Sequence, residues 1–371
     1  MRRVLVVLGV LLIVLAVTLR LTLGGGARLE DPSGPPELPA SALELVADLD
    51  YPPGNIAVSA KGRVFFTYHP DGDPPHHLME LVDGRPEPYR PKIMPPLETP
   101  LAVRIDRFHR LWVLDHARFG RGQPRLVGFD TTNDALIHQF KFPKDVAPFG
   151  SMLNDFQFDV RAENFYIADA SPIRGTPALV AYSTLPRRAV RFFEGHHSVQ
   201  PQDYVLNVGG RDMSLFGLVT LRIGVDSIAV DQKHEWLYFG PVNGTRLYRV
   251  LASELHFESG MTSEDLVGTI QDHGPKPNSD GLATDADGNI YITAPEHSAI
   301  MVLGPDKKLR TLVKDERLRW PDGLSFGPDG WLYVTCSALQ HVLFRTAGHQ
   351  RAHAPYQIYR FRPGPTGIPG R

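Results

Sequence analysis

The sequence has almost no cysteine and no excess of either charge. Cys336 is the only cysteine among 371 residues, which excludes an intramolecular disulfide. The net charge of −2 gives no basic surface for nucleic acid, and we expect no nucleic-acid partner. The sequence also lacks a phosphate-binding loop, a serine nucleophile elbow and a dinucleotide fingerprint. Because no intramolecular disulfide can form, the stability of the fold must come from the burial of apolar side chains.

The one long apolar run lies at the N-terminus. Arg2 and Arg3 precede apolar residues 4–17, and the run continues past Arg20 to Leu23. This length and positive flank indicate a signal peptide or a signal anchor. No A-x-A cleavage site is clear, so we favour an anchor that is retained. The two arginines would stay inside, which predicts a secreted, periplasmic or membrane-anchored body outside the cytoplasm.

Composition divides the chain into four parts. Residues 1–27 form the leader, and residues 28–41 form a linker rich in proline and glycine. The folded body spans residues 42–362, and residues 363–371 form a C-terminal tail. Glycine and proline are plentiful overall, with 34 and 33 residues, which suits an architecture with many tight turns.

One pattern recurs six times in the body: a small polar residue, an apolar stretch, a tight turn and a second strand rich in aromatics. The clearest copies run from Asp280 to Ile292 and from Asp322 to Val334, each across an Asp-Gly turn. The six anchor positions are Asn55, Leu101, Asn154, Asp226, Asp280 and Asp322. They recur about every 40 to 55 residues, with one interval of about 72, which suits a four-stranded blade per unit. The sequence predicts an all-β fold, a six-bladed β-propeller.

Closure of the ring and one insertion complete this prediction. Leu43–Leu49 and Tyr356–Phe361 are expected to join the two ends of the chain in one blade. The longest interval contains an insertion, Phe192–Leu221, which we expect to form a long loop over one face of the ring. Helical periodicity is almost absent, and Thr262–Val267 is the one segment where a short helix is expected.

These residues resemble the yellow/major royal jelly protein family. The matching segments are Trp112–Asp115, Leu153–Phe156, Gly224–Ala229, Trp236–Pro241 and Ser279–Gly281. The resemblance covers roughly Leu43 to Phe361 and implies a six-bladed propeller, similar to the gluconolactonase/senescence-marker lactonases. It implies lactonase-like activity in bacterial relatives, and dopachrome tautomerisation or amine binding in insect ones. The sequence lacks the cysteines of the insect extracellular members, so the bacterial branch is the closer analogy.

The anchors are the candidate site residues, because the first strand of each blade lines the central channel. Asn55, Asn154, Asp226 and Asp280 are expected to point oxygen atoms at a common centre. An oxygen-only set suits Ca²⁺ or another divalent cation, and no His-rich or Cys-rich set has zinc spacing. The lactonase resemblance implies a metal held by a glutamate and by later Asn, Asn and Asp residues. Asn154, Asp226 and Asp280 match the later positions, with Asp226 replacing an asparagine and Asn55 replacing the glutamate.

This donor set favours a hydrolase that opens a small cyclic ester with the help of a metal ion. Asp280 is the first candidate to orient or deprotonate water, and Asp226 is the second. Asp155 is expected to hold the amide of Asn154 in place. Two alternatives stay open: a non-catalytic propeller that binds a small molecule, and a dopachrome-type isomerase implied by the family.

Other tempting residues have simpler interpretations. Asp322 is expected to be structural. The acids that begin the hairpin turns are also expected to be structural; they are Asp106, Asp159, Asp231 and Asp285. The pairs His76-His77 and His196-His197 are expected in exposed loops, and Cys336 is expected in the core. Trp320 is the tryptophan that we place at the mouth of the channel.

Overall fold

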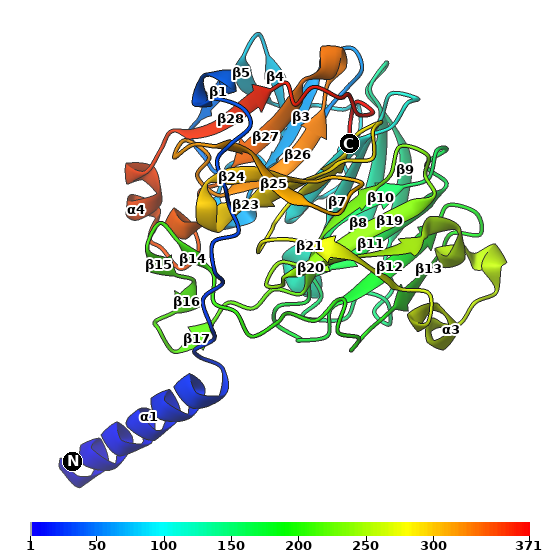
Figure 1. Ribbon diagram of the computed structural model, residues 1–371. Coiled ribbons are helices and arrows are strands. Elements are labelled where there is room, and N and C mark those ends of the chain that lie inside the picture. The colour runs from blue at the N-terminus through cyan, green and yellow to red at the C-terminus, as the bar shows by residue number, and fades with distance from the viewer. Residues whose placement is uncertain (1) are drawn as a thin grey trace.

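The computed structural model describes residues 2–371 and shows six four-stranded antiparallel sheets arranged around a channel (Figure 1). Blade one holds β2 (Pro53–Val58), β3 (Val64–Tyr68), β4 (Leu78–Val82) and β5 (Arg85–Pro88). Blade two holds β6 (Pro100–Ile105), β7 (Arg110–Asp115), β8 (Arg125–Asp130) and β9 (Ala135–Lys141). Blade three holds β10 (Leu153–Phe158), β11 (Asn164–Asp169), β12 (Ala178–Ser183) and β13 (Arg188–Phe192). The predicted propeller is confirmed.

The other three blades continue this order. Blade four holds β18 (Val225–Val230), β19 (Trp236–Pro241), β20 (Arg246–Leu251) and β21 (Gln271–Pro275). Blade five holds β22 (Leu282–Thr284), β23 (Ile290–Ala294), β24 (Ala299–Leu303) and β25 (Leu309–Lys314). Blade six combines β26 (Pro321–Phe326), β27 (Leu332–Cys336) and β28 (Tyr356–Phe361) with β1 (Glu44–Leu49) from the other end of the body. The β1–β28 pairing confirms the predicted closure, which joins the two ends of the body in one blade without a disulfide.

Helices are short outside the N-terminus. They are α1 (Arg2–Thr22), α2 (Ala117–Gly120), α3 (Ser263–Val267) and α4 (Ala347–Ala352). Short 3₁₀ turns cover Ala40–Ala42, Pro70–Gly72, Ala252–Leu255, Phe257–Ser259, Pro295–His297, Pro328–Gly330 and Leu339–His341. The expected helix at Thr262–Val267 is confirmed as α3, because the Thr262 hydroxyl and the Asp265 carboxylate form a capping box there. Helices α2 and α4 were not predicted, and both lie in loops between second and third strands.

The turn acids hold the hairpins as predicted. The Asp106 carboxylate accepts from the backbone N–H groups of Phe108 and Arg110 at 2.8 and 3.0 Å. Asp159, Asp231 and Asp285 accept in the same way from the backbone of their own turns. These carboxylates satisfy turn amides that the ladder leaves unpaired, so they shape the fold and are not site residues.

Aromatic side chains fill the space between neighbouring blades. Between blades two and three, Trp112 packs against Phe165 with ring centroids 4.7 Å apart, and Phe140 stacks on Tyr182 at 4.1 Å. Trp112 is buried, and its indole N–H donates to Asp106 at 2.9 Å. Large flat side chains are suited to these wedge-shaped interfaces because they bury much apolar area at low entropic cost.

β-Bulges interrupt the inner strands at the anchor positions. The register of the inner pair shifts around Asn55, Leu101, Asn154, Asp226 and Asp322 in blades one, two, three, four and six. A bulge bends its strand and re-aims the side chain of the extra residue. In blade five, Asp280 lies two residues before β22 begins. The anchors are therefore re-aimed at one end of the channel.

Threonine hydroxyls in three blades satisfy the backbone that these irregular segments leave unpaired. Thr335 Oγ1 accepts from Gly323 N at 2.9 Å in its own blade and donates to Gly54 O of blade one at 2.6 Å. Thr67 Oγ1 links Asn55 N to Leu101 O of blade two in the same manner. In blade five, Thr293 Oγ1 accepts from the backbone of Asp280 at 3.1 Å. Two of these hydroxyls also join one blade to the next.

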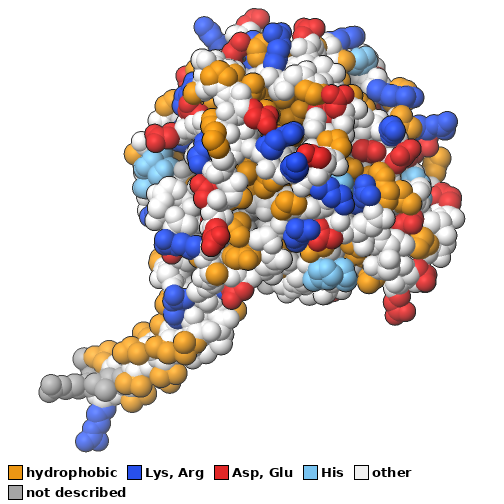
Figure 2. Space-filling view, viewed as in Figure 1, with side chains coloured by type: hydrophobic (Ala, Val, Ile, Leu, Met, Phe, Trp, Pro, Cys, Tyr) orange, Lys and Arg blue, Asp and Glu red, His pale blue; other side chains and the backbone are white. Residues whose placement is uncertain are grey.

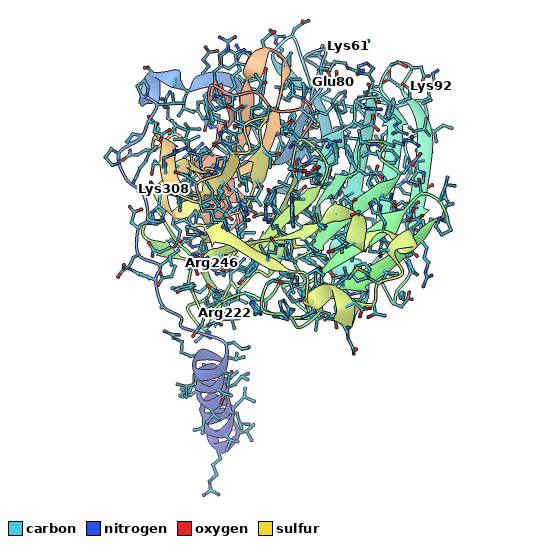
Figure 3. All side chains as sticks on the ribbon, turned by 45° about the vertical axis from the view of Figure 1, so that its right-hand side comes forward. Lys61, Glu80, Lys92, Arg222, Arg246 and Lys308 are labelled. Carbon is cyan, nitrogen blue, oxygen red and sulfur yellow. The ribbon has the colours of Figure 1, made fainter. Side chains whose placement is uncertain are left out.

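The insertion forms two small hairpins that hold the chain leaving α1. They are β14 (Asn207–Val208) with β15 (Arg211–Asp212), and β16 (Ser214–Leu215) with β17 (Val219–Thr220). Thr220 Oγ1 donates to Gly25 O at 2.7 Å, and Arg222, labelled in Figure 3, donates to Leu23 O at 2.9 Å. Figure 1 shows β16 and β17 between α1 and the blades. Helix α1 is long and apolar enough to cross a membrane, a test that a signal sequence near the N-terminus also passes.

The linker and the C-terminal tail both form backbone hydrogen bonds with strands of the propeller. The linker does not simply span the gap between α1 and the body, because Glu37 and Leu38 donate backbone hydrogen bonds to Thr311 and Leu312 of β25. At the other end, Ile105 N donates to Gly370 O at 3.1 Å, and Phe326 N donates to Arg371 O at 2.7 Å. The C-terminal tail therefore lies across the ends of the inner strands β6 and β26, opposite the anchors.

Candidate functional site

A cavity of about 430 Å³ lies at the end of the channel where the inner strands begin. The anchors lie at its floor, namely Asn55, Leu101, Asn154, Asp226, Asp280 and Asp322. Its walls come from the loops that precede first strands or join second to third strands, and include Phe119, Met152, Ile173, Leu221, Ile223, Leu339, Leu343 and Phe344. The structure therefore brings all four predicted site residues to one place. The cavity has a polar floor and mostly apolar walls.

Glycines next to the anchors allow the blades to meet at this floor. A Cβ on Gly281 would overlap the carbonyl oxygen of Asp322, and a Cβ on Gly323 would lie 2.8 Å from the Cα of Asn55. Side chains at these positions would push neighbouring blades apart. The Asp-Gly pairs at 280–281 and 322–323 thus combine a side chain for the channel with a residue that permits close backbone approach.

Three carboxyl groups share the floor and destabilise each other's charge. Burial raises the pKa of Asp226 well above its ordinary value, and the charges of Asp280 and Asp155 raise it further. The pKa of Asp322 is also raised, first by burial and then by Asp280 and Asp226. Burial raises the pKa of Asp280 to about 6, although its hydrogen bond from Trp320 opposes the shift. Electrostatic coupling among these groups is the mark of a site suited to positive charge.

Two of the predicted site residues are already oriented by hydrogen bonds. The Asn154 Nδ2 donates to Asp226 Oδ1, which turns the Asn154 carbonyl oxygen away from that carboxylate. The Trp320 indole N–H donates to Asp280 Oδ2 at 2.6 Å. Trp320 is buried and adopts a left-handed backbone conformation with φ of 53°. A strained aromatic residue that fixes a carboxylate is a feature of pre-organised sites. Trp320 lines the cavity, as predicted.

Asn55 differs from its expected role because Arg104 is its partner. The buried Arg104 guanidinium donates to Asn55 Oδ1 through Nη1 and to Asp155 Oδ2 through Nη2, the latter at 2.7 Å. Asn55 Oδ1 also accepts from Ile56 N at 2.8 Å. This amide oxygen is saturated by two donors, one of them cationic, so Asn55 is poorly placed to ligate a metal.

Asp155 also holds a different amide from the one expected. It was predicted to hold Asn154, whereas its Oδ1 accepts from Asn55 Nδ2 at 3.4 Å and its other oxygen pairs with Arg104. Burial raises the pKa of Asp155, and the Arg104 charge opposes that shift. A charged residue inside the otherwise apolar strand β6 is the signal in the sequence that would have revealed this pair.

Two further residues of the cavity were not predicted from the sequence. Asp322, expected to be structural, belongs to the acidic floor, and its equivalence to the other anchors was the available signal. His69 lines the cavity beside Asp71, and burial lowers its pKa. Its Nδ1 accepts from Asp71 N at 3.2 Å, so the neutral ring carries its proton on Nε2. No pattern in the sequence marked His69.

The floor fits a hard divalent cation by its chemistry. Among the described residues, no lysine or arginine forms a salt bridge with Asp226, Asp280 or Asp322. Carboxylate and amide oxygens are the ligands that such cations prefer, and a cation would offset the mutual repulsion that raises these pKa values. Cys336 is not a competing nucleophile, because burial raises its pKa to about 12.

Solved structures share this architecture at low sequence identity. A luciferin-regenerating enzyme is 12% identical with a TM-score of 0.58, covering 88% of this chain and 97% of its own. A gluconolactonase from Xanthomonas campestris is 11% identical with a TM-score of 0.55, covering 91% and 99%. Regucalcin from Agrobacterium tumefaciens, a calcium-binding protein, is 14% identical with a TM-score of 0.52, covering 88% and 94%. At such identities the likeness shows the fold alone.

The comparison of sequences gives a narrower result. No curated protein matches the chain. The sequence profile of the major royal jelly proteins matches residues 99–358, which run from the start of blade two into the last strand of blade six. This match covers more than half of the sequence. The chain therefore belongs to the major royal jelly protein family.

Proposed function

We propose that the protein is a lactonase-like hydrolase that opens a cyclic ester in the mouth of the central channel. The observation that carries this proposal is the convergence of Asp226, Asp280 and Asp322 with Asn154 at the floor of one cavity. Burial raises the pKa of each of these carboxyls, and neighbouring carboxylates raise the pKa values of Asp226 and Asp322 further, which separate structural acids on a surface would not show. The fold shared with a gluconolactonase supports the same reaction class.

Asn154, Asp226 and Asp280 would hold the divalent cation, with Asp322 beside them, and we take Ca²⁺ as the first candidate. When bound, the ion supplies Lewis-acid polarisation of a carbonyl oxygen. Asn55 is left out of this set, because its amide oxygen is bound by Arg104. Arg104 instead opposes the rise in the pKa of Asp155 and binds Asn55 where it contacts Asp155.

Asp280 is the proposed general base. In the metal-free floor its pKa is about 6, so it is a carboxylate at neutral pH. Its Oδ2 is bound by Trp320, so Oδ1 is the oxygen available to accept a proton from water. Asp226, with the more strongly raised pKa, is positioned by Asn154 and serves as the second acidic group.

The cavity walls favour an apolar substrate over a sugar lactone. Leucine, isoleucine, phenylalanine and methionine side chains form most of the wall above the acidic floor. Such a surface excludes water from the reacting ester and binds hydrocarbon, but it offers few donors or acceptors for sugar hydroxyls. We therefore propose a lactone with an alkyl or aryl substituent.

The position of α1 supports a membrane-bound enzyme whose mouth faces the bilayer. We propose that α1 is retained as an anchor with the propeller outside the cytoplasm. The insertion and the residues that follow it bind Leu23 and Gly25, and they also supply Leu221 and Ile223 to the cavity wall. Several apolar side chains on loops at the cavity end of the propeller are exposed to solvent. They are Phe149, Ile173, Phe216 and Phe344, which are 60, 57, 87 and 50% exposed. Figure 2 shows the apolar surface of α1 projecting from the body. A substrate dissolved in the membrane would have a short path to the site.

The experiment is a hydrolysis screen with the full-length protein in detergent micelles. Alkyl-substituted and sugar lactones are compared after chelation and after calcium is restored. We expect turnover of alkyl lactones that disappears with chelator, returns with calcium and is lost in Asp280→Asn. Asp287→Asn, an exposed acid in the same blade, is the matched control and should keep full activity. Stabilisation by lactones without any hydrolysis in calcium would contradict the proposal and favour a non-catalytic binding propeller.

A further inference from the structure

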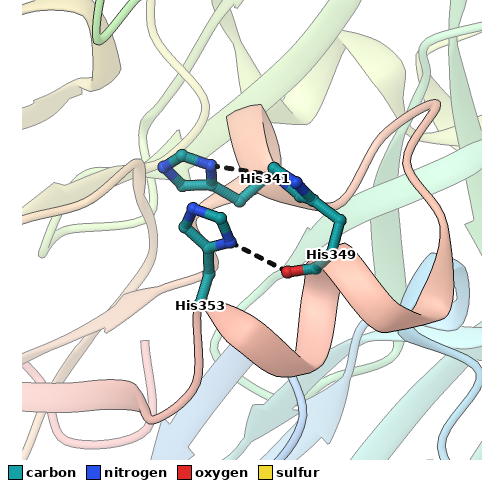
Figure 4. A group of neighbouring side chains, drawn as sticks. All are labelled: His341, His349 and His353. Atoms are coloured by element: carbon teal, nitrogen blue, oxygen red, sulfur yellow. Dashed lines mark hydrogen bonds between the residues drawn. The ribbon is translucent and has the colours of Figure 1, made fainter.

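Three histidines outside the channel come together in the long connection between β27 and β28. His341 ends a 3₁₀ turn, His349 lies on α4, and His353 caps that helix. One ring nitrogen from each lies within 4.8 Å of the others (Figure 4). No histidine set with zinc spacing was expected from the sequence. That was wrong, because His349 and His353 are four residues apart on one helical turn and the fold adds His341.

One pair of ring nitrogens already has the separation that a shared metal ion requires, and the third nitrogen lies within 4.8 Å of both. His341 Nδ1 lies 3.4 Å from His349 Nε2. Two histidine ligands at a tetrahedral zinc ion, each about 2.0–2.1 Å from the metal, are separated by roughly 3.3 Å. The His341 and His353 rings also stack at 3.8 Å with an angle of 17°, and the His349 and His353 rings stack at 4.2 Å. The three side chains are thus close together, and the stacked rings must turn before their in-plane lone pairs can converge on one ion.

The hydrogen bond at His353 fixes which of its nitrogens is available. Its Nδ1 donates to the backbone carbonyl of His349 at 2.8 Å, which leaves the lone pair on Nε2. Metal-binding histidines almost always donate their other N–H to a carbonyl or carboxylate in this way. Thr346 caps α4 by accepting from His349 N at 3.3 Å, so the helix that carries two of the rings is held at its start.

Three arginines lie near the cluster, namely Arg211, Arg319 and Arg345. The arginines oppose a cation, but two of them are engaged elsewhere: Arg211 donates to Leu343 O at 3.0 Å and Arg319 to His353 O at 3.0 Å.

We propose that His341, His349 and His353 form a binding site for zinc that is separate from the acidic floor of the channel. Nitrogen-only ligands suit Zn²⁺ and not Ca²⁺, so the two sites would select different metals. The three protein ligands leave a fourth position for water. The same connection supplies Leu339, Leu343 and Phe344 to the cavity wall. A zinc ion bound to the histidines of this connection would therefore hold this part of the cavity wall in place.

The test uses full-length protein in detergent, stripped of metal and then saturated with calcium, so that zinc meets only the remaining sites. Calorimetric titration with ZnCl₂ at pH 7.5 should give one zinc per chain. Binding should weaken at least tenfold in His349→Gln and in His353→Gln. His197→Gln is the matched control, because His196 and His197 form an adjacent pair of rings without a third, and it should bind zinc as the unchanged protein does.

A second readout separates a metal site from a purely structural role. Zinc should slow hydrogen exchange of the amides in residues 338–354 in the unchanged protein, and not in His349→Gln. The calcium response of the channel should be the same in both proteins, which shows that the variant is folded. Cobalt should replace zinc and give the absorption of a tetrahedral nitrogen-bound ion. Zinc binding that is equally tight in both glutamine variants, or no binding to the unchanged protein at 0.1 mM zinc, roughly the upper range of useful affinities, would overturn the proposal.

Discussion

Replacing Asp280 with asparagine should stabilise the metal-free protein while abolishing its activity. Asparagine keeps the shape of the side chain and an oxygen that can accept from the Trp320 indole, but it removes a charge from the acidic floor. Burial raises the pKa of Asp280 from 3.8 to about 6 in the folded protein. The folded state therefore binds this proton more tightly than the unfolded chain does. The stability contributed by the proton is complete below about pH 4 and is lost as the pH rises through about 6.

The size of the effect follows from that shift. Each pKa unit corresponds to about 1.4 kcal/mol, so the charged Asp280 costs at most about 3 kcal/mol at pH 7.5. Asp280 is partly open to the cavity, which reduces the expected gain to roughly 1–3 kcal/mol. A gain of this size raises Tm by about 2 to 6 °C in a large domain. At pH 4 both proteins should melt together, because Asp280 is then protonated.

The assay is thermal unfolding of full-length protein in detergent with chelator, at pH 4 and at pH 7.5. Asp285→Asn is the matched control in the same blade. Its carboxylate accepts from Asp287 N, Asn289 N and the Tyr291 hydroxyl, so this variant should be less stable than the unchanged protein at both pH values. An Asp280→Asn protein that is less stable at pH 7.5, or equally shifted at both pH values, would refute the electrostatic account of the floor.

Three further changes test the supports of the site. Arg104→Met should cost about 3–5 kcal/mol in chemical unfolding at pH 7.5, because the buried Asp155 carboxyl loses its cationic partner. The cost should be smaller at pH 5, where protonation of Asp155 is easier, and equal losses at both pH values would contradict this. Thr335→Val should cost about 2 kcal/mol, since Gly323 N and Gly54 O lose their bridge, while Thr335→Ser should keep it. Removal of residues 364–371 should speed hydrogen exchange at Ile105 and Phe326, whose amides bond to the tail, and unchanged exchange would show that the tail does not cover the channel.

The architecture was readable from the sequence because each blade repeats its own local signals. The Asp-Gly turns after the anchors and the apolar strands on either side specify hairpins, and their spacing specifies six units. The closure of the ring could also be predicted, because two strand-like segments lie near the ends of the body. What the sequence did not show was the bulge at each anchor, because a register shift depends on how two strands pair and leaves no fixed residue signature.

The floor of the site was predicted better than its supporting contacts. Asn154, Asp226 and Asp280 converge because they hold equivalent positions in a closed ring, which the repeat alone could reveal. Asn55 holds the same kind of position, yet Arg104 from the next blade occupies its oxygen. Contacts between blades join residues about 50 positions apart, and no local pattern predicts which side chain reaches across. The histidine cluster was missed for the same reason, since His341 joins the pair on α4 only through the fold of the loop.

The most direct test of the account is terbium luminescence, in which Tb³⁺ takes the place of calcium as a hard, oxygen-seeking ion and is excited through tryptophan. Because the Trp320 indole contacts Asp280, an ion held by Asn154, Asp226 and Asp280 should give sensitised emission. The account predicts one terbium ion per chain, displaced by calcium, lost in Asp226→Asn and bound but dimmer in Trp320→Phe. Undiminished binding in an Asp226→Asn, Asp280→Asn double variant, or no binding to the unchanged protein, would contradict it.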